Sequence, residues 1–175
     1  LSSLSRDGWF YFVANSTKTT IYFNNNSSRD PLLAVYTGAC GSLTLVGCAN
    51  ANGSSSDETI SALTTTIGTT YRIRIARNGN GSGTLNGSVC VYNVPDVTSF
   101  SPSPICTGAQ LTITGTGFTG ATGVTINGTA ATSVTVVNST TITCTVASGT
   151  TSGTVVVTGP GGTGTSPSSL TVNST

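Results

Sequence analysis

Residues 106–129 read CTGAQLTITGTGFTGATGVTINGT, and this stretch contains no charged side chain. Runs of Thr, Val, Ile and Leu alternate in it with Gly and Asn. Thr and the other β-branched residues favour strands, whereas Gly and Asn favour turns. Asn127-Gly128, between two alternating runs, is a strong signal for a tight hairpin. The stretch therefore predicts short antiparallel strands joined by glycine turns.

The same pattern fills the second half of the chain. Strand-like segments recur there at a spacing of about 8–12 residues, which is typical of a β-sandwich. They are QLTITG, GVTING, TSVTVV, TTITCTV, GTVVVTG and SLTVN. No segment of the chain shows a helical period, so we expect an all-β protein.

The first half also holds strand-like runs, and the clearest is TTYRIRIARNGNG at residues 69–81. Its alternation predicts one face turned to a core and one turned to solvent. The inward residues are Tyr71, Ile73 and Ile75, and the outward residues are Arg72 and Arg74. A ligand-binding role for the two arginines is the alternative. With LNGSVCVYNV at 85–94, the run is predicted to form a hairpin.

Charge is scarce in this chain. Only 6% of its 175 residues are charged, the net charge is +1, and nothing after Asp96 is charged. An ordinary soluble domain is about 25% charged. No run reaches the roughly 18 apolar residues of a membrane-spanning helix. The basic residues are not clustered enough to follow a phosphate backbone, so we expect neither a membrane span nor nucleic-acid binding.

A change in composition suggests where the chain divides. Pro95, Pro102 and Pro104 cluster where the charged first half ends. Proline resists both helices and central strands. We expect two domains, residues 1–94 and residues 95–175. The sequence has neither a signal peptide nor a Met, so we expect a mature secreted product or a fragment.

The five cysteines suggest an oxidising compartment. No His is present and no CxxC occurs, so disulfides are a more natural interpretation than zinc. Cys40 and Cys48 flank a short turn-like stretch and are a candidate pair, and Cys106 and Cys144 could form a second. Cys90 is then left over, either as a buried thiol or as an intermolecular bridge.

The chain lacks the residues of a catalytic site. Without His, the usual general base is missing, and Ser or Cys has no activating partner. We expect no enzymatic activity and no cofactor. A calcium site built from Asp30, Asp57 or Glu58 is conceivable, but no calcium-loop pattern is present. We expect these carboxylates to lie in exposed turns and predict no metal site.

Residues 96–175 resemble an IPT/TIG domain, an immunoglobulin-like sandwich. The resemblance rests on PDVTSFSP (95–102), LTITGTGFTGAT (111–122), VTINGTAAT (124–132), TTITCTV (140–146) and GTVVVTGPGGTGTS (153–166). It implies that Gly115 and Gly117 permit a sharp turn before Phe118, which plugs the core. Gly159–Gly162 should form the last hairpin turn.

Residues 7–93 resemble the bacterial PPC-type (pre-peptidase C-terminal) domain, a jelly-roll-like β-sandwich of about eight strands. The resemblance rests on DGWFYF (7–12), DPLLAVYTGACGSL (30–43), LVGCAN (45–50) and GTTYRIRI (68–75). It supports a Cys40–Cys48 disulfide. Both families occur in large secreted or cell-surface bacterial proteins and are usually non-catalytic. We expect Trp9, Phe10, Tyr71 and Phe118 to anchor the two cores.

An uncharged sandwich needs protected strand edges, because charge and proline normally prevent strand addition. TSVTVV and GTVVVTG carry no such residue, so we expect glycan or another subunit to cover them. O-glycans on Thr-rich faces are an alternative to N-glycans, and the sequons could also be bare. The nine sequons are at Asn15, Asn25, Asn26, Asn52, Asn80, Asn86, Asn127, Asn138 and Asn173.

These observations predict an extracellular, non-catalytic protein of a bacterial cell surface. The first interpretation is a structural or adhesion protein, plausibly a glycosylated filament subunit, whose partners are copies of itself or other surface proteins and glycans. The alternative is a carbohydrate-binding accessory module of a secreted hydrolase, which would need a face of exposed aromatic rings. A spacer between functional domains is the third interpretation.

Overall fold

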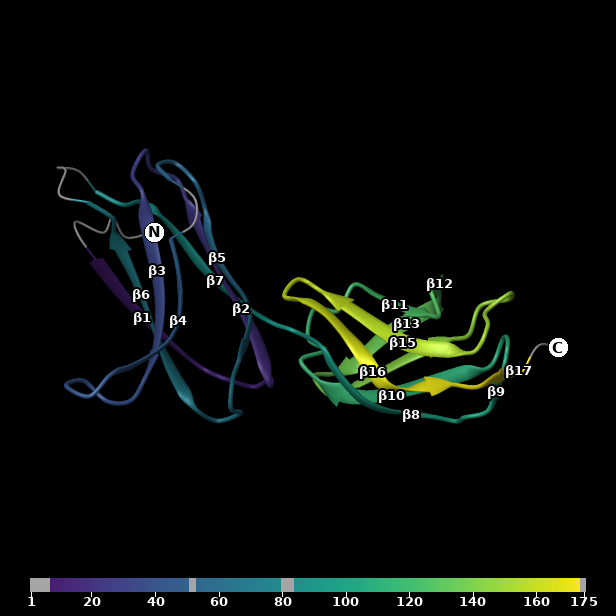
Figure 1. Cartoon of the computed structure of the whole chain (residues 1–175). Helices are drawn as coiled ribbons and strands as arrows, with labels where there is room; N and C mark the ends of the chain where they lie inside the picture. The colour runs from purple at the N-terminus through teal and green to yellow at the C-terminus, as the bar shows by residue number, and fades with distance from the viewer. Residues whose placement is uncertain (1–6, 51–52, 80–83, 174–175) are drawn as a thin grey trace. The chain divides into compact units, whose positions relative to one another are not determined.

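The computed structural model describes residues 7–50, 53–79 and 84–173, and every regular element in this part is a β-strand (Figure 1). The all-β prediction is confirmed. In the described part, no helix could cross a membrane. The strands are β1 (Asp7–Val13), β2 (Lys18–Asn25), β3 (Pro31–Thr37), β4 (Thr44–Ala49), β5 (Glu58–Thr64), β6 (Thr70–Arg77), β7 (Gly87–Asn93), β8 (Asp96–Ser101), β9 (Ile105–Cys106), β10 (Gln110–Thr116), β11 (Gly123–Ile126), β12 (Thr129–Ala130), β13 (Thr132–Asn138), β14 (Thr141–Thr145), β15 (Gly153–Gly159), β16 (Gly162–Leu170) and β17 (Val172–Asn173).

The chain divides into two compact units. One reaches Ala14 and resumes from Thr19 to Tyr92, and the other comprises Asn15–Lys18 and the chain from Asn93 onward. The division at Tyr92–Asn93 lies two residues before the expected boundary. The segment Asn15–Lys18 joins the second unit through hydrogen bonds, such as that from Ser16 Oγ to Val94 O at 2.9 Å. The domain bounds 1–94 and 95–175 stay a prediction.

The first unit is a β-sandwich. One sheet has the order β1-β6-β3-β4 and the other the order β5-β2-β7. Buried side chains from both sheets form one core, which includes Ile21 and Phe23 of β2 and Leu33 and Val35 of β3. Within the described residues the unit has seven strands, against about eight expected from the PPC-type resemblance.

The alternation predicted for β6 is confirmed, but its predicted hairpin partner is wrong. Tyr71, Ile73 and Ile75 are buried in the core. However, β6 pairs with β1 and β3, whereas β7 belongs to the opposite sheet. The connection after β6 therefore crosses between sheets instead of turning back beside the same strand. Alternation alone does not distinguish these two connections, because both end in a half-buried strand.

The second unit is also a β-sandwich, built from the sheets β13-β14-β10-β8 and β12-β11-β15-β16. A short parallel pair, β17 with β9, completes it. The core includes Leu111 and Ile142 from one sheet and Val124 and Val155 from the other. The expected Asn-Gly hairpin joins β11 to β12, with φ of 47° at Asn127 and 82° at Gly128. The last hairpin is also confirmed, since Gly159 lies opposite Gly162.

Two glycines allow the chain to close around Phe118, which is fully buried. Gly115 lies at an irregularity in the pairing of β10 with β8. A Cβ there would overlap the Asp96 carbonyl oxygen and lie 2.6 Å from Phe118 Cζ. Gly117 has a φ of +72°, and its Cβ would lie 2.6 Å from Val94 O. The role expected of both glycines follows from backbone and side-chain packing.

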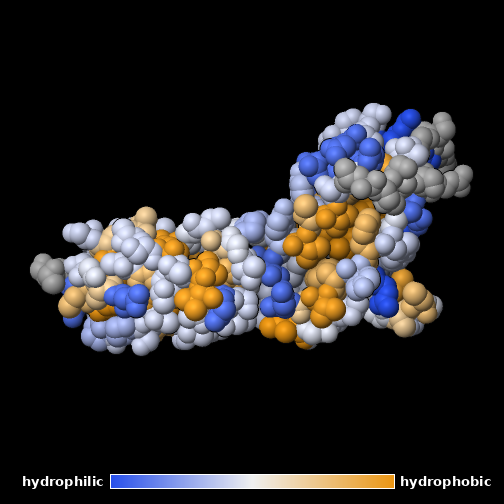
Figure 2. Space-filling model, turned by 180° about the vertical axis from the view of Figure 1, so that it is seen from behind, coloured by the Kyte–Doolittle hydropathy of each residue, from blue (hydrophilic) through white to orange (hydrophobic). Residues whose placement is uncertain are grey.

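The two strands that lacked protecting residues have different positions in the sheets. GTVVVTG is β15, which lies between β11 and β16 and has no free edge. TSVTVV lies in β13, an edge strand whose register shifts twice and whose Ser133 has a φ of 50°. Bulges of this kind twist an edge away from regular pairing. The surface of this unit, left in Figure 2, is mostly pale, with apolar patches between residues of intermediate hydropathy.

A hydrogen-bonded corner connects β2 to β5 in the first unit. The Asp57 carboxylate accepts hydrogen bonds from the Tyr22 hydroxyl and, at 2.8 Å, from Asn25 N–H. These bonds hold the pKa of Asp57 below its usual range, and the same contact raises the pKa of Tyr22. The buried Asn25 amide donates to Arg29 O at 2.8 Å and Ser56 O at 3.1 Å.

We expect Gly115→Ala to lower the free energy of unfolding by about 1–3 kcal/mol, the usual cost of forcing extra volume into a packed site. Gly123→Ala is the matched control, because a Cβ at Gly123 meets nothing within 4 Å. Its effect should stay within about 0.5 kcal/mol. Urea unfolding followed by circular dichroism measures both. Equal losses would contradict a specific contact at Gly115.

We expect Asp57→Asn to lower the melting temperature at pH 7, with a difference from the unaltered protein that shrinks on acidification. A carboxyl group whose folded-state pKa is lowered stabilises the protein fully above its ordinary pKa of about 4. That stabilisation is lost as the pH falls through the lowered value. Melting curves at pH 7 and pH 3 test this. A difference that stays constant would show that the Asp57 charge does not stabilise the corner.

Candidate functional site

The outer face of the sheet β1-β6-β3-β4 carries exposed aromatic rings. Alternate residues of a strand share a face, and the register places two rows of side chains across this one. In one row Tyr11, Arg72, Tyr36 and Leu45 lie opposite one another, and in the next Trp9, Arg74, Ala34 and Cys48 do. Trp9 is 47% exposed and Tyr11 is 77% exposed. We call Trp9, Tyr11 and Tyr36 the aromatic face.

Two of the four expected core anchors are therefore wrong. Tyr71 and Phe118 are buried, but Trp9 and Phe10 are exposed. Trp9 lies opposite the outward Arg74 and so faces away from the core. Phe10 lies opposite the buried Ile73, yet β1 is an edge strand opposite a sheet of only three strands, and the ring remains 38% exposed. The register, not the apolar composition of GWFYFV, decides which rings are covered.

Contacts among the side chains hold part of the aromatic face in place. The ring centroids of Trp9 and Tyr36 are 5.6 Å apart, with an angle of 41° between their planes. Arg74 lies over Trp9, with its Cζ 5.8 Å from the ring centroid. Its Nε also donates to Asp7 Oδ2 at 3.1 Å. Trp9 and Tyr36 thus form a supported pair, and the more exposed Tyr11 lies across β6 from Tyr36.

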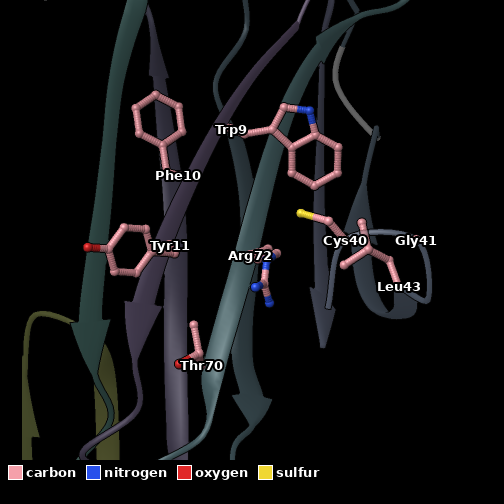
Figure 3. A pocket seen from close by; sticks show the side chains of 8 residues that line it. All are labelled: Trp9, Phe10, Tyr11, Cys40, Gly41, Leu43, Thr70 and Arg72. Carbon is pink, nitrogen blue, oxygen red and sulfur yellow. The ribbon is translucent and has the colours of Figure 1, made fainter. Parts of the chain in front are cut away.

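A cavity of about 550 Å³ opens beside these rings. Figure 3 shows Arg72 between Tyr11 and the loop that carries Cys40, Gly41 and Leu43. Arg72 Nη1 donates to the Gly38 carbonyl oxygen, which lies just before this loop. The residues that line the cavity are Trp9, Phe10, Tyr11, Cys40, Gly41, Leu43, Thr70 and Arg72.

The cavity places aromatic surface beside a few polar groups. It presents aromatic surfaces, the Thr70 hydroxyl, the Cys40 thiol and the Arg72 guanidinium. Flat apolar surfaces with a few polar groups beside them are typical of ligand pockets. The sequence predicted Tyr36 only as part of a strand. For Arg72 and Arg74, ligand binding was the alternative to a solvent-facing role. The missing information was the register that brings three separate strands together.

All five cysteines are free in the structure, so neither predicted disulfide is formed. Cys144 points into the core opposite Leu111, and burial raises its pKa to about 11. Cys106 is exposed on β9. Cys40 is exposed in the β3–β4 loop, and Cys48 lies on β4 opposite Ala34. Cys90, expected to be buried, is only half-buried.

The three carboxylates considered for calcium do not come together. Asp57 binds Tyr22 and Asn25, Asp30 accepts from Asn78 at 2.9 Å, and Glu58 is buried. The expectation of an exposed turn is wrong for Glu58, which begins β5. No group of three or more possible metal ligands occurs in the described part of the chain.

The predicted glycosylation sites differ in accessibility. Asn25 is a buried residue, 8% exposed, and its amide donates a hydrogen bond to Arg29 O, so its glycosylation stays a prediction with the least accessible side chain of the described sites. Asn52 and Asn80 lie outside the described residues. Asn15, Asn26, Asn86, Asn127, Asn138 and Asn173 are exposed. Of these, the Asn127 amide donates to Thr151 Oγ1 at 2.8 Å. Glycosylation of the exposed sites stays a prediction.

Three solved structures align with nearly the whole chain at low similarity. They are SGBP-B from a xyloglucan utilization locus of Bacteroides uniformis (15% identity, TM-score 0.39), gamma-CGTase from alkalophilic Bacillus clarkii (18%, 0.38) and a structure with xylogluco-oligosaccharide (21%, 0.40). The alignments cover 97–98% of this chain but 50%, 23% and 40% of those chains. The chain thus spans half or less of their length. At these TM-scores, neither a shared fold nor a shared ligand follows.

Among curated proteins there is no match to the chain. The family model of the IPT/TIG domain matches residues 95–172. This range begins in the turn before β8 and ends in β17, and it contains both sheets of the second unit. The match does not extend to the first unit, whose resemblance to the PPC-type domain stays a prediction. Residues 95–172 are an IPT/TIG domain.

Proposed function

We propose that the chain is an extracellular, non-catalytic carbohydrate-binding module that holds glycan on the aromatic face of its first unit. The observation that carries this proposal is the exposure of Trp9 and Tyr11 beside a cavity, on a sheet whose opposite face already supplies the core. This is the exposed aromatic surface that the carbohydrate-binding alternative required. The attached IPT/TIG domain is compatible with a surface or accessory role.

The chemistry of the rings favours a sugar ligand. The face of an aromatic ring is negative at its centre, so it attracts the C–H groups on the apolar side of a pyranose. Tyr11 and Tyr36 lie on strands separated by β6, which places them roughly 10 Å apart at the usual strand spacing. Two stacking positions along one face suit an extended chain of sugar rings better than a single small molecule.

The filament interpretation has weaker support. It rested on two uncovered strands, but β15 is interior and β13 is an irregular edge. These two strands therefore need no covering subunit to avoid regular strand addition. Self-association, adhesion and a spacer role remain separate proposals.

We expect Trp9→Ala and Tyr11→Ala each to weaken glycan binding about tenfold or more. Exposed aromatic anchors in binding sites commonly contribute over about 1 kcal/mol each, and 1.4 kcal/mol corresponds to a tenfold change. Affinity gel electrophoresis against a panel of soluble plant and bacterial polysaccharides identifies a ligand. Isothermal titration calorimetry then measures the change in affinity.

Ile67→Ala is the matched control, because Ile67 is a 53% exposed apolar residue of the same unit outside the cavity lining. It should leave binding unchanged. The proposal would be overturned if no polysaccharide retards the protein, or if the losses for Trp9→Ala and Ile67→Ala are equal. Circular dichroism confirms that each variant is folded.

A further inference from the structure

Resting on the proposed function, we infer that the glycan held at the aromatic face is acidic, with Arg72 binding the carboxylate of a uronic acid residue. The site has a second property beyond its exposed rings, which is a positive charge without an internal partner. Arg72 is the charged residue in the lining of the cavity. Unlike Arg74, Arg72 has no carboxylate partner among the residues that the structure describes.

The two outward arginines of β6 have different electrostatic partners. Arg74 is neutralised by Asp7 at 3.1 Å and lies over Trp9. Arg72 donates to a neutral backbone carbonyl, that of Gly38, and it makes no ion pair with the residues that the structure describes. Its positive charge is therefore not cancelled within the site. An anion from outside can pair with it without displacing a protein carboxylate.

The remaining carboxylates are engaged or placed elsewhere. Asp57 binds Tyr22, Asp30 binds Asn78, and Asp96 accepts a hydrogen bond from Thr17 at 2.9 Å. Glu58 is buried at the start of β5. None of these acids lines the cavity. The lining of the cavity therefore carries one positive charge and no negative charge, which favours an anionic ligand over a cationic one.

The position of Arg72 suits a carboxylate on a stacked sugar. Arg72 lies in the same row as Tyr11 and Tyr36, between them on β6. It is half-buried, and the bond to Gly38 holds one of its nitrogens. The other guanidinium nitrogens still carry donors in the planar arrangement that matches a carboxylate. A sugar ring on Tyr11 or Tyr36 brings a carboxylate on that ring within reach of Arg72.

A pair of polysaccharides that differ only in charge tests this inference. Polygalacturonate carries a carboxylate on each sugar, and fully methyl-esterified polygalacturonate has the same backbone without the charge. We expect the protein to bind the first and to bind the second at least tenfold more weakly. Quenching or shift of the fluorescence of Trp9, the single tryptophan of the chain, reports occupation of the site directly.

Arg72→Gln should weaken polygalacturonate binding by about tenfold to a hundredfold, the range for losing hydrogen bonds to a charged group. Arg29→Gln is the matched control, because it removes the same charge at a residue outside the cavity lining. It should leave binding unchanged. Arg72→Lys keeps the charge without the planar donors and should lie between the unaltered protein and Arg72→Gln, which separates loss of charge from disturbance of the loop.

Different outcomes separate this inference from the proposed function. Equal binding of both polygalacturonates overturns the acidic ligand, and unchanged binding by Arg72→Gln overturns the role of Arg72. Both results leave glycan binding intact. Binding to dextran sulfate but not to polygalacturonate or alginate overturns the carboxylate in favour of a sulfate. Binding to a neutral polysaccharide of the panel but to none of these acidic glycans overturns this inference alone, and no binding to any polysaccharide of the panel overturns both proposals.

Discussion

The antiparallel register of β1 against β6 determines which aromatic side chains of the first unit are exposed to solvent. It sets Trp9 opposite Arg74 and Tyr11 opposite Arg72, while Ile73 and Ile75 point into the core. Side chains alternate with a period of two, so a slip of one residue would bury both outward rings and expose the inward ones. Burial of the β6 isoleucines therefore fixes the aromatic face indirectly, because a slip by one residue would exchange the inward and outward side chains of β1.

The core of the first unit is complete without the exposed rings. Its buried members come from several strands, among them Ile21 of β2, Leu33 of β3 and Ile60 of β5. Trp9 and Tyr11 are thus free to serve a function at the surface, where large rings in contact with water are otherwise unfavourable. The two outward arginines of this sheet have different surroundings. Arg74 pairs with Asp7, whereas Arg72 lines the cavity.

The second unit shows how an IPT/TIG domain with no charged residue after Asp96 keeps its strands protected. Its core is closed around Phe118, and Gly115 and Gly117 let the backbone approach that ring. The valine-rich strand β15 is shielded because it lies inside its sheet, and β13 is irregular because of its shifts in register. The interior position of β15 and the irregular geometry of β13 thus prevent strand addition, which charged side chains prevent at most strand edges.

The sequence by itself determined the local features of this protein. Alternation in TTYRIRI separated buried from outward residues, Asn127-Gly128 specified a hairpin, and the motifs from 95 onward identified the IPT/TIG domain. These are properties of neighbouring residues. Only the tertiary structure decided that β6 and β7 lie in opposite sheets, that Cys106 is exposed while Cys144 is buried, and that Trp9, Arg72 and Tyr36 share one face. These depend on pairing between distant strands, and many pairings satisfy the same alternation until packing of the whole core selects one.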